Sequence, residues 1–285
     1  MTTVNTRFRS PLRRFLRLAL TLLALHTHLH AGPAENAAEV ERIIATGTRG
    51  NGPVLWFARD AERNLGSGHS TWAATSGGRL SERGLDPWGR ANSAFGLARG
   101  AVGGAAVSGS KAYSPINPKG GSIVLFCRPS SGAKPPLLLF SNADWGAAGY
   151  LSLRINAVNG RLELTLASSD PGTTNKARQT SFATLYPGRW SFVALSWQEA
   201  GSQCVFRYWA GSLDEQELTY GELEAPPIAE SKSMFLIAGR RADDQGALGL
   251  PSLAFEGGLI SQFAVFDTPL SEDVVQRLFV ASTRP

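Results

Sequence analysis

Residues 150–167 read YLSLRINAVNGRLELTLA. Apolar and polar residues alternate in Tyr150–Val158 and again in Arg161–Ala167, which is typical of strands with one buried and one solvated face. Asn159-Gly160 between them is the strongest short signal for a hairpin turn. The stretch therefore predicts an antiparallel hairpin within a sheet. The side chains expected on its water-facing side are Ser152, Arg154, Asn156, Arg161, Glu163 and Thr165.

Similar short runs, separated by turn signals, occur on both sides of this hairpin. No helical patterns alternate with them, so the sequence predicts an all-β fold, a two-sheet antiparallel jelly-roll sandwich. The other expected strands are Pro53–Ala58, Ser93–Leu97, Ser122–Arg128, Leu137–Ser141, Arg189–Gln198, Gln203–Ala210, Gln216–Gly221, Met234–Gly239 and Leu259–Phe266.

Two segments outside the strands have helical character. A short C-terminal helix is expected over Ser271–Phe279, because Ser271 can cap its first amides. One apolar face of this helix, made of Val274, Val275, Leu278 and Phe279, suits docking on the sandwich. Pro33–Thr46 is either a short helix that ends at Gly47 or a linker.

Composition supports a globular β protein and argues against a nucleic-acid partner. Hydrophobic residues make up 43% of the 285 residues, enough for a core, and the 31 glycines and 16 prolines indicate many turns. The net charge of +5 comes from five arginines in the first 31 residues. Without them, 23 of the 28 basic residues remain against 23 acidic ones. A neutral body does not attract phosphate backbones.

The N-terminus has the pattern of a secretory signal. The basic stretch Arg7–Arg17 precedes the apolar run Leu18–Leu25, and small residues follow, with cleavage expected after Ala31 or Ala34. The run is shorter than the about 20 residues that span a bilayer. A cleaved chain would have no stable membrane span and would be secreted or lie in the periplasm or cell envelope. A retained anchor and a buried or interfacial N-terminal helix stay open as alternatives.

Four segments, in this order, carry a family resemblance: Gly121–Pro129, Gly188–Trp197, Val205–Gly211 and Phe255–Ser271. They resemble strand motifs of the concanavalin A-like lectin/glucanase superfamily, in its laminin G-like (pentraxin-like) form, over roughly residues 50–282. The resemblance implies one jelly-roll domain over 50–285, preceded by the signal peptide over 1–31 and the linker or short helix over 32–49 that the N-terminal pattern predicts. Ser261 and Ala210 replace the family's polar residues, which weakens inferences about polar sites.

Catalytic motifs are missing from the sequence. The glucanase branch of the superfamily places its carboxylates as Glu-x-Asp-x-x-Glu, and this chain has no such motif. The densest acidic run, Asp214–Glu217, lies next to a turn and is interpreted as a solvated loop. No nucleophile elbow, phosphate loop or His-Glu-x-x-His is present. A non-catalytic role is therefore expected.

Tryptophans in loops are the candidate ligand-binding residues. Asp144 and Trp145 lie between two predicted strands, where the ring can stack on a sugar and the carboxylate can bond its hydroxyls. Trp72 and Trp88 lie in other loops rich in Gly and Ser and are candidates for the same reason. The alternative for each tryptophan is a ring packed over the edge of the sandwich.

Calcium is the cofactor that the resemblance suggests, since laminin G-like domains often bind it. Asp243 and Asp244, together with Asp144, supply the loop oxygens that this ion requires. The alternative is that they are ordinary turn residues. Cys127 and Cys204 both fall on predicted strands with inward side chains, and either a disulfide or two buried thiols fits.

The leading hypothesis is an exported, non-catalytic recognition domain that binds carbohydrate or an extracellular protein through loops of the sandwich. Two alternatives belong to other classes. One is a glycoside hydrolase or lyase with an unfamiliar active-site pattern. The other is a purely structural adhesion module. The fold by itself does not choose among these functions.

Overall fold

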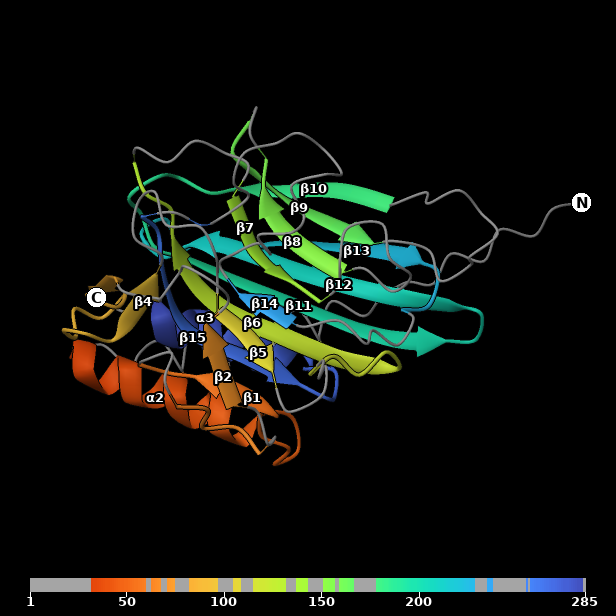
Figure 1. Cartoon of the computed structure of the whole chain (residues 1–285), viewed down its shortest axis with the longest axis horizontal. Helices are drawn as coiled ribbons and strands as arrows, with labels where there is room; N and C mark the ends of the chain where they lie inside the picture. The colour runs from red at the N-terminus through yellow and green to blue at the C-terminus, as the bar shows by residue number, and fades with distance from the viewer. Residues whose placement is uncertain are drawn as a thin grey trace, which may run out of the picture.

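A computed structural model describes residues 32–59, 63–67, 71–74, 82–96, 105–108, 115–131, 137–142, 151–156, 159–166, 178–228, 235–237, 255 and 257–283. Strands dominate these residues (Figure 1). The elements, in chain order, are α2 (Pro33–Thr46), β1 (Leu55–Phe57), β2 (Thr71–Ala74), β3 (Glu82–Gly84), β4 (Ala94–Gly96), β5 (Ala105–Ser108), β6 (Gly120–Arg128), β7 (Leu137–Ser141), β8 (Leu151–Ile155), β9 (Arg161–Leu166), β10 (Arg178–Thr184), β11 (Ser191–Ala200), β12 (Gln203–Ser212), β13 (Thr219–Ala225), β14 (Phe235–Ile237), β15 (Leu259–Phe266) and α3 (Glu272–Ser282).

The strands form two antiparallel sheets, which confirms the predicted all-β sandwich. The first sheet has the order β13-β12-β11-β6-β15-β4-β3, and β1 also pairs with β15. The second sheet has the order β10-β9-β8-β7-β14-β5-β2. Strands that neighbour each other in a sheet are often far apart in sequence, as β6 and β15 are.

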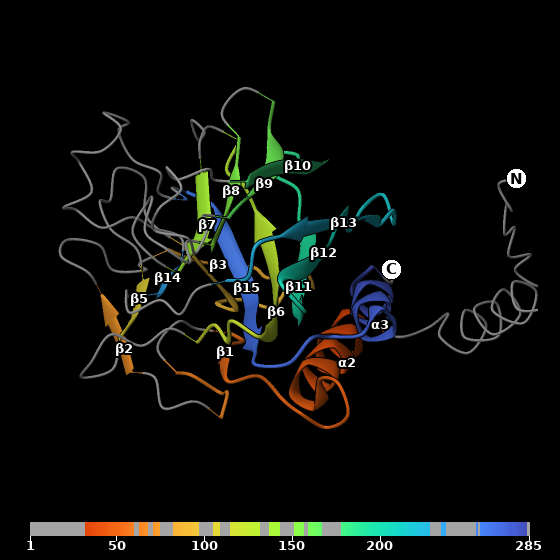
Figure 2. The same ribbon diagram turned by 90° about the vertical axis from the view of Figure 1, so that its right-hand side faces the viewer.

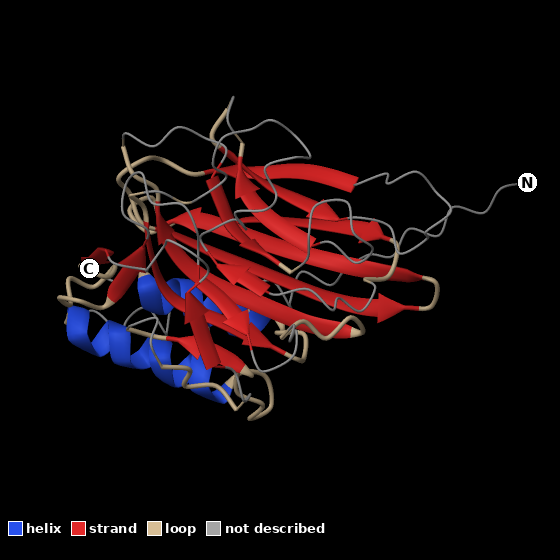
Figure 3. Cartoon of the chain, in the orientation of Figure 1, coloured by secondary structure: helices blue, strands red, loops and turns tan. Residues whose placement is uncertain are grey.

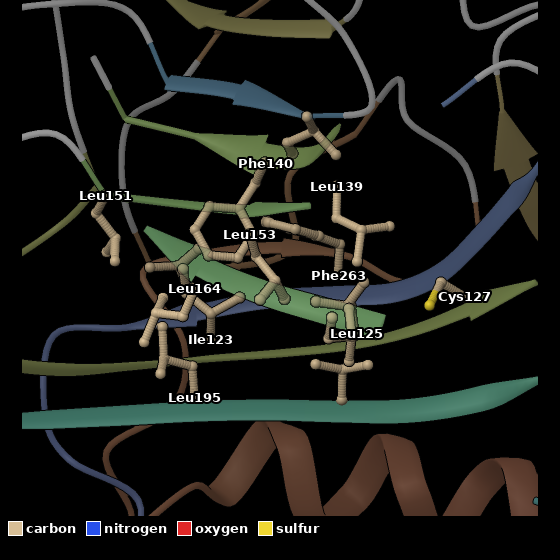
Figure 4. Close-up of a cluster of buried hydrophobic side chains, with 14 of the residues drawn as sticks. Ile123, Leu125, Cys127, Leu139, Phe140, Leu151, Leu153, Leu164, Leu195 and Phe263 are labelled. Carbon is tan, nitrogen blue, oxygen red and sulfur yellow. The ribbon is translucent and has the colours of Figure 1, made fainter. Parts of the chain in front are cut away.

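Apolar side chains from both sheets meet in a core between them (Figure 4). Ile123 and Leu125 of β6 and Leu195 of β11 point toward Leu153 and Leu164 of the second sheet. All are buried, and each such side chain contributes about 1.5–3 kcal/mol on leaving water. This inter-sheet core fixes which face of each strand points outward.

The two helices cover the other face of the first sheet (Figures 2 and 3). Val40 and Ile44 of α2 and Val275 of α3 are buried in the same cluster as Phe126 and Phe266 of the sheet. Strands of the first sheet are therefore buried on both faces, which explains why β6 and β15 read as apolar runs rather than as alternating ones. Neither of the helices in the described residues is long and apolar enough to cross a membrane.

Both helical segments behave as integral parts of the packing. Pro33–Thr46 is a helix, one of the two interpretations left open, and its backbone leaves the helix at Gly47 with a φ of +52°. The expected C-terminal helix is also present. The Ser271 side chain accepts a hydrogen bond from the Val274 amide at 3.4 Å, as predicted for its cap.

The predicted hairpin is β8–β9, with Gly160 in the left-handed region at a φ of +68°. Its apolar side chains face the core as expected, but the prediction of a water-facing polar side is wrong for Ser152, Glu163 and Thr165, which are buried. Alternation reveals which side of a sheet a residue occupies and not what lies against that side.

Several other strands differ from the sequence prediction. β13 runs over Thr219–Ala225 rather than Gln216–Gly221, because Gln216 is in the preceding turn with a φ of +54°. β2, β3, β5 and β10 were not among the strands expected individually from the sequence. The acidic run Asp214–Glu217 is exposed beside that turn, in agreement with a solvated loop.

The two cysteines lie at opposite ends of β11, which decides between the two interpretations. Cys127 is level with Ser191, and Cys204 is level with Glu199. Eight residues of strand separate these levels by about 26 Å, whereas a disulfide needs Cα atoms within about 7 Å. Both cysteines are free and buried in the inter-sheet core.

We therefore expect two free thiols per chain, both protected in the folded protein. Burial raises the pKa of Cys127 and of Cys204 to about 12, so neither forms the reactive thiolate near neutral pH. Ellman's reagent should titrate two thiols in denaturant without reductant and almost none in native buffer at pH 8. Titration of no thiols in denaturant would show a disulfide and contradict the fold.

Candidate ligand-binding face

A set of polar side chains lies on the second sheet, on the side away from the inter-sheet core. Figure 2 shows the strands that carry it, β7 to β9, on the side of the molecule opposite α2 and α3. We call this set the polar face; its members are Ser141, Ser152, Arg154, Asn156, Glu163 and Thr165.

Strand register places the members of the polar face in two adjacent rows. Ser141, Ser152 and Thr165 are direct neighbours across β7, β8 and β9. Arg154 and Glu163 are direct neighbours in the next row. Side chains opposite each other on neighbouring antiparallel strands have Cβ atoms about 4.5–5.5 Å apart, so each row is a continuous polar strip.

The second row contains a buried ion pair. Arg154 Nε donates to Glu163 Oε2 at 2.9 Å, and the two side chains are only 16% and 9% exposed. Glu163 Oε1 also accepts hydrogen bonds from the Asn156 side-chain amide and, at 3.5 Å, from the Ser181 hydroxyl. The carboxylate is therefore held by three side-chain donors, which is what a buried charge requires.

The first row contains two hydroxyls without partners. Ser152 and Thr165 are both 0% exposed, and neither the Ser152 Oγ nor the Thr165 Oγ1 has a hydrogen-bond partner. A buried polar atom left unpaired costs about 1–3 kcal/mol, and such an atom in a folded protein calls for an explanation. A group that both donates and accepts, placed between them, would satisfy both hydroxyls.

Exposure increases along the sheet from the hydroxyl row toward Arg161. Ser152 and Thr165 are buried, Arg154 and Asn156 are intermediate, and Arg161 is exposed. The Arg161 guanidinium donates to the backbone carbonyl oxygen of Phe182 at 2.6 Å, where β10 has a register shift. Among the described residues of these strands, exposure is therefore greatest at the Arg161 end of β9.

The side chains predicted from sequence as a binding site lie mostly outside the described residues. This holds for Asp144, Trp145, Asp243 and Asp244. Trp72 lies on β2, at the edge of the second sheet, opposite Val107. Among the described residues, no group of three His, Cys, Asp or Glu could hold a metal ion. Calcium binding therefore stays a prediction.

Trp88 is the predicted site residue whose side chain the structure places. It is 7% exposed and packs in the cluster under the helices, with its ring edge-on to Phe126 at 5.3 Å between centroids. The Arg90 guanidinium lies 5.4 Å above the ring. The Trp88 ring is therefore packed against the sandwich, which was the alternative to stacking on a sugar.

A second polar network connects helix α2 to the first sheet beside Trp88. Glu41 of α2 accepts hydrogen bonds from Arg59 Nη2 at 3.2 Å and Gln262 Nε2 at 3.1 Å, and pairs with Arg90 Nη1 at 2.8 Å. Arg90 Nε donates to the buried Asp86 at 2.6 Å. Burial raises the pKa of Glu41, but hydrogen bonds from Arg59 and Arg90 outweigh it and hold the pKa below its usual value.

This network fixes the helix on the sheet. Gln262 is buried at a register shift of β15 and has a φ of +52°, an unusual conformation for a residue with a side chain. Its Oε1 accepts a hydrogen bond from Trp56 Nε1 at 3.0 Å. The charged side chains that hold α2 pair with one another, although Trp88 Nε1 and Arg90 Nη2 are buried without a partner. The polar face differs in having two unpaired hydroxyls directly opposite each other on neighbouring strands, so it is the better candidate for a ligand.

The sequence did not identify the polar face as a site. Its residues read as the water-facing side of an ordinary hairpin, and their burial comes from tertiary structure. The one available signal is the concentration of hydroxyl and charged residues at matching positions of two strands joined by a tight turn.

Comparison with known proteins shows the fold and no family. No model of a protein family matches the sequence, and no curated protein matches it significantly. A solved structure of botulinum neurotoxin type C, described in connection with cell entry through two ganglioside molecules, is similar with a TM-score of 0.50 and 13% identity. It matches over 85% of this chain and 53% of its own.

A sialidase of Trypanosoma rangeli, solved with difluorosialic acid as a covalent intermediate, is similar to the same extent. Its TM-score is 0.51 at 13% identity, over 87% of this chain and 38% of the sialidase. The chain thus spans about half the length of the neurotoxin structure and less of the sialidase. At this identity the likeness establishes a shared β-sandwich only.

Proposed function

We propose that this protein is an exported, lectin-like domain of the laminin G-like kind that binds glycans on its polar face. The observation that carries the proposal is the pair of buried, opposing hydroxyls of Ser152 and Thr165, which lack partners beside the Arg154–Glu163 ion pair. Sugar hydroxyls both donate and accept, so a sugar can satisfy both side chains at once.

Two further observations support a glycan over a protein partner. The neurotoxin structure of similar fold is described as acting through gangliosides, which are glycolipids. The large apolar side chains that are exposed within the described residues are few and belong to separate elements of the chain, whereas the centre of a protein interface is rich in apolar and aromatic side chains. They are Leu65, Leu85, Tyr186, Tyr220 and Val280.

Binding is favoured over hydrolysis by the carboxylates of the polar face. Glycosidases use a pair of carboxyl groups on either side of the scissile bond. Among the described residues of the polar face, Glu163 is the one carboxylate, and it is held by Arg154, Asn156 and Ser181. Such a carboxylate is suited to holding its neighbours in place.

Loop residues predicted from the sequence are proposed to extend this site. Asp144 and Trp145 belong to the segment that joins β7 to β8, the strands that carry Ser141 and Ser152. Trp72 is the third proposed contact, and Asp243 with Asp244 the proposed calcium ligands.

Glycan binding should depend on the unpaired hydroxyls. We expect the purified protein to bind members of a glycan array, and Ser152→Ala and Thr165→Val each to weaken that binding about tenfold, the value of one hydrogen bond. Folding stability should not fall by more than about 0.5 kcal/mol, because each change removes a hydroxyl that has no partner.

Ser212→Ala is the matched control, since the Ser212 hydroxyl is also buried without a partner but lies on β12 of the first sheet. It should leave glycan binding unchanged. An array without hits, or equal losses in all three variants, would contradict the proposal.

Export is the second part of the proposal, and the start of α2 favours cleavage after Ala31. The Gly32 carbonyl accepts hydrogen bonds from the amides of Glu35 at 2.9 Å and Asn36 at 3.1 Å, so cleavage after Ala34 would remove the first turn. Gly32 N also lies 3.1 Å from Glu35 Oε2, where a new terminal ammonium would be paired. N-terminal sequencing of exported protein should start at Gly32; a start at Met1 would show an uncleaved chain.

A further inference from the structure

We infer that the polar face selects neutral sugars over acidic ones and that Glu163 sets this selectivity. The inference rests on the proposed glycan binding and adds the chemical class of the ligand. It follows from the pairing of the charged side chains of the polar face with one another and from their burial.

Among the side chains that the structure describes, the positive charge nearest the hydroxyl pair is already neutralised. Arg154 is 2.9 Å from Glu163, and both side chains are largely removed from water. Charges that are removed from water interact strongly with each other. An acidic sugar could therefore bind Arg154 only by displacing the Glu163 carboxylate. The guanidinium therefore offers no net attraction to an anion.

The other arginine of the hairpin does not supply that attraction either. The Arg161 guanidinium donates hydrogen bonds to the backbone carbonyl oxygens of Phe182 and Ser181. Arg161 lies four residues from Thr165 along β9, which corresponds to about 13 Å, and its side chain is exposed. Over that distance in salt solution its field at the hydroxyl pair is screened.

Glu163 sets the selectivity by cancelling the charge of Arg154, not by repelling the ligand. It lies two residues from Thr165 on the same side of β9, about 7 Å along the strand, and is buried. Arg154 lies equally far from Ser152 on β8, so the two charges cancel at the hydroxyl pair, and a sugar carboxylate placed there would lose its hydration without gaining a counter-charge. A neutral sugar meets the same hydroxyls without this penalty, so selectivity arises by exclusion of the acidic ligand.

Two pairs of glycans that differ in charge test the inference: lactose against sialyllactose, and the methyl ester of tetragalacturonic acid against the free acid. For each pair that binds, the wild type should bind the neutral member at least about tenfold more tightly than the acidic member. The affinity for that neutral member should stay within about twofold as salt rises.

Glu163→Gln keeps the size and an acceptor oxygen but leaves Arg154 without a counter-charge. In this variant the affinity for the neutral member should exceed that for the acidic member by less than about twofold, or the acidic member should bind more tightly. The wild-type comparison and its salt dependence test the inference even if this variant does not fold.

Different results would contradict glycan binding and the selectivity for neutral sugars. If neither these pairs nor a wider array contains a ligand, glycan binding itself is contradicted. If the wild type binds sugars but holds the acidic members equally well or better, glycan binding stands and the selectivity is contradicted. An unchanged preference in folded Glu163→Gln would remove Glu163 as its determinant.

Discussion

Arg90→Met should lower the free energy of unfolding by about 3 kcal/mol. Arg90 is the charged partner of Asp86, whose side chain is 0% exposed, and it also pairs with Glu41 of α2. Methionine fills similar space but leaves the Asp86 carboxylate buried without a counter-charge. Removing one member of a buried pair costs far more than the pair itself contributes.

Arg59→Met is the matched control for this prediction. Arg59 pairs with the same Glu41, but its side chain is 60% exposed against 21% for Arg90. An exposed pair contributes about 0–1 kcal/mol, so this variant should be nearly as stable as the wild type. Urea unfolding of both variants measures the difference, and equal small losses would show that the network does not hold α2.

Lowering the pH should remove part of the stabilisation that the pairing of Glu41 with Arg59 and Arg90 provides. The pKa of Glu41 is lowered in the folded protein by Arg59 and Arg90, so its contribution is present above the unfolded value of about 4.3. It is lost as pH falls through the lowered pKa.

Ile44→Ala should cost about 3 kcal/mol, the second large effect. Ile44 lies on α2, is 0% exposed, and packs in the cluster between the helices and the first sheet. Arg42→Ala on the same helix is the control, because Arg42 is exposed and pairs only with Glu39 one turn away. It should change the free energy of unfolding by less than about 1 kcal/mol.

Thermal or urea unfolding distinguishes the two possible roles of this segment. If Pro33–Thr46 were a linker without a place in the core, Ile44→Ala would cost no more than Arg42→Ala. A large and selective loss shows that the domain begins at α2, before the first strand.

The sequence predicted local structure best where two signals coincided. The β8–β9 hairpin had both strict alternation and Asn159-Gly160, and its strands and inward side chains were confirmed. β10 lacked such a signal, since Arg178–Thr184 contains one large apolar residue among polar ones. It is held by pairing with β9, which sequence periodicity does not reveal.

The candidate site was harder to predict because it depends on burial and on distant contacts. Ser152 and Thr165 were placed on the correct side of the sheet, yet nothing in their alternation shows that they are shielded from water. The sequence left open whether Trp88 stacks on a sugar or packs on the sandwich, because its contact with Phe126 joins segments far apart in the chain. The pairing of Glu41 with Arg90 likewise exists only in the folded protein.

The proposed binding of a sugar to the second sheet at Ser152 and Thr165 can be observed in solution. Titration of the isotope-labelled exported protein with the tightest-binding neutral glycan of the array, followed by NMR amide shifts, tests it most directly. We expect the largest shifts at β8 and β9 around these two residues, with α2 and α3 unchanged. Shifts confined to the helices or to the first sheet would contradict the assignment.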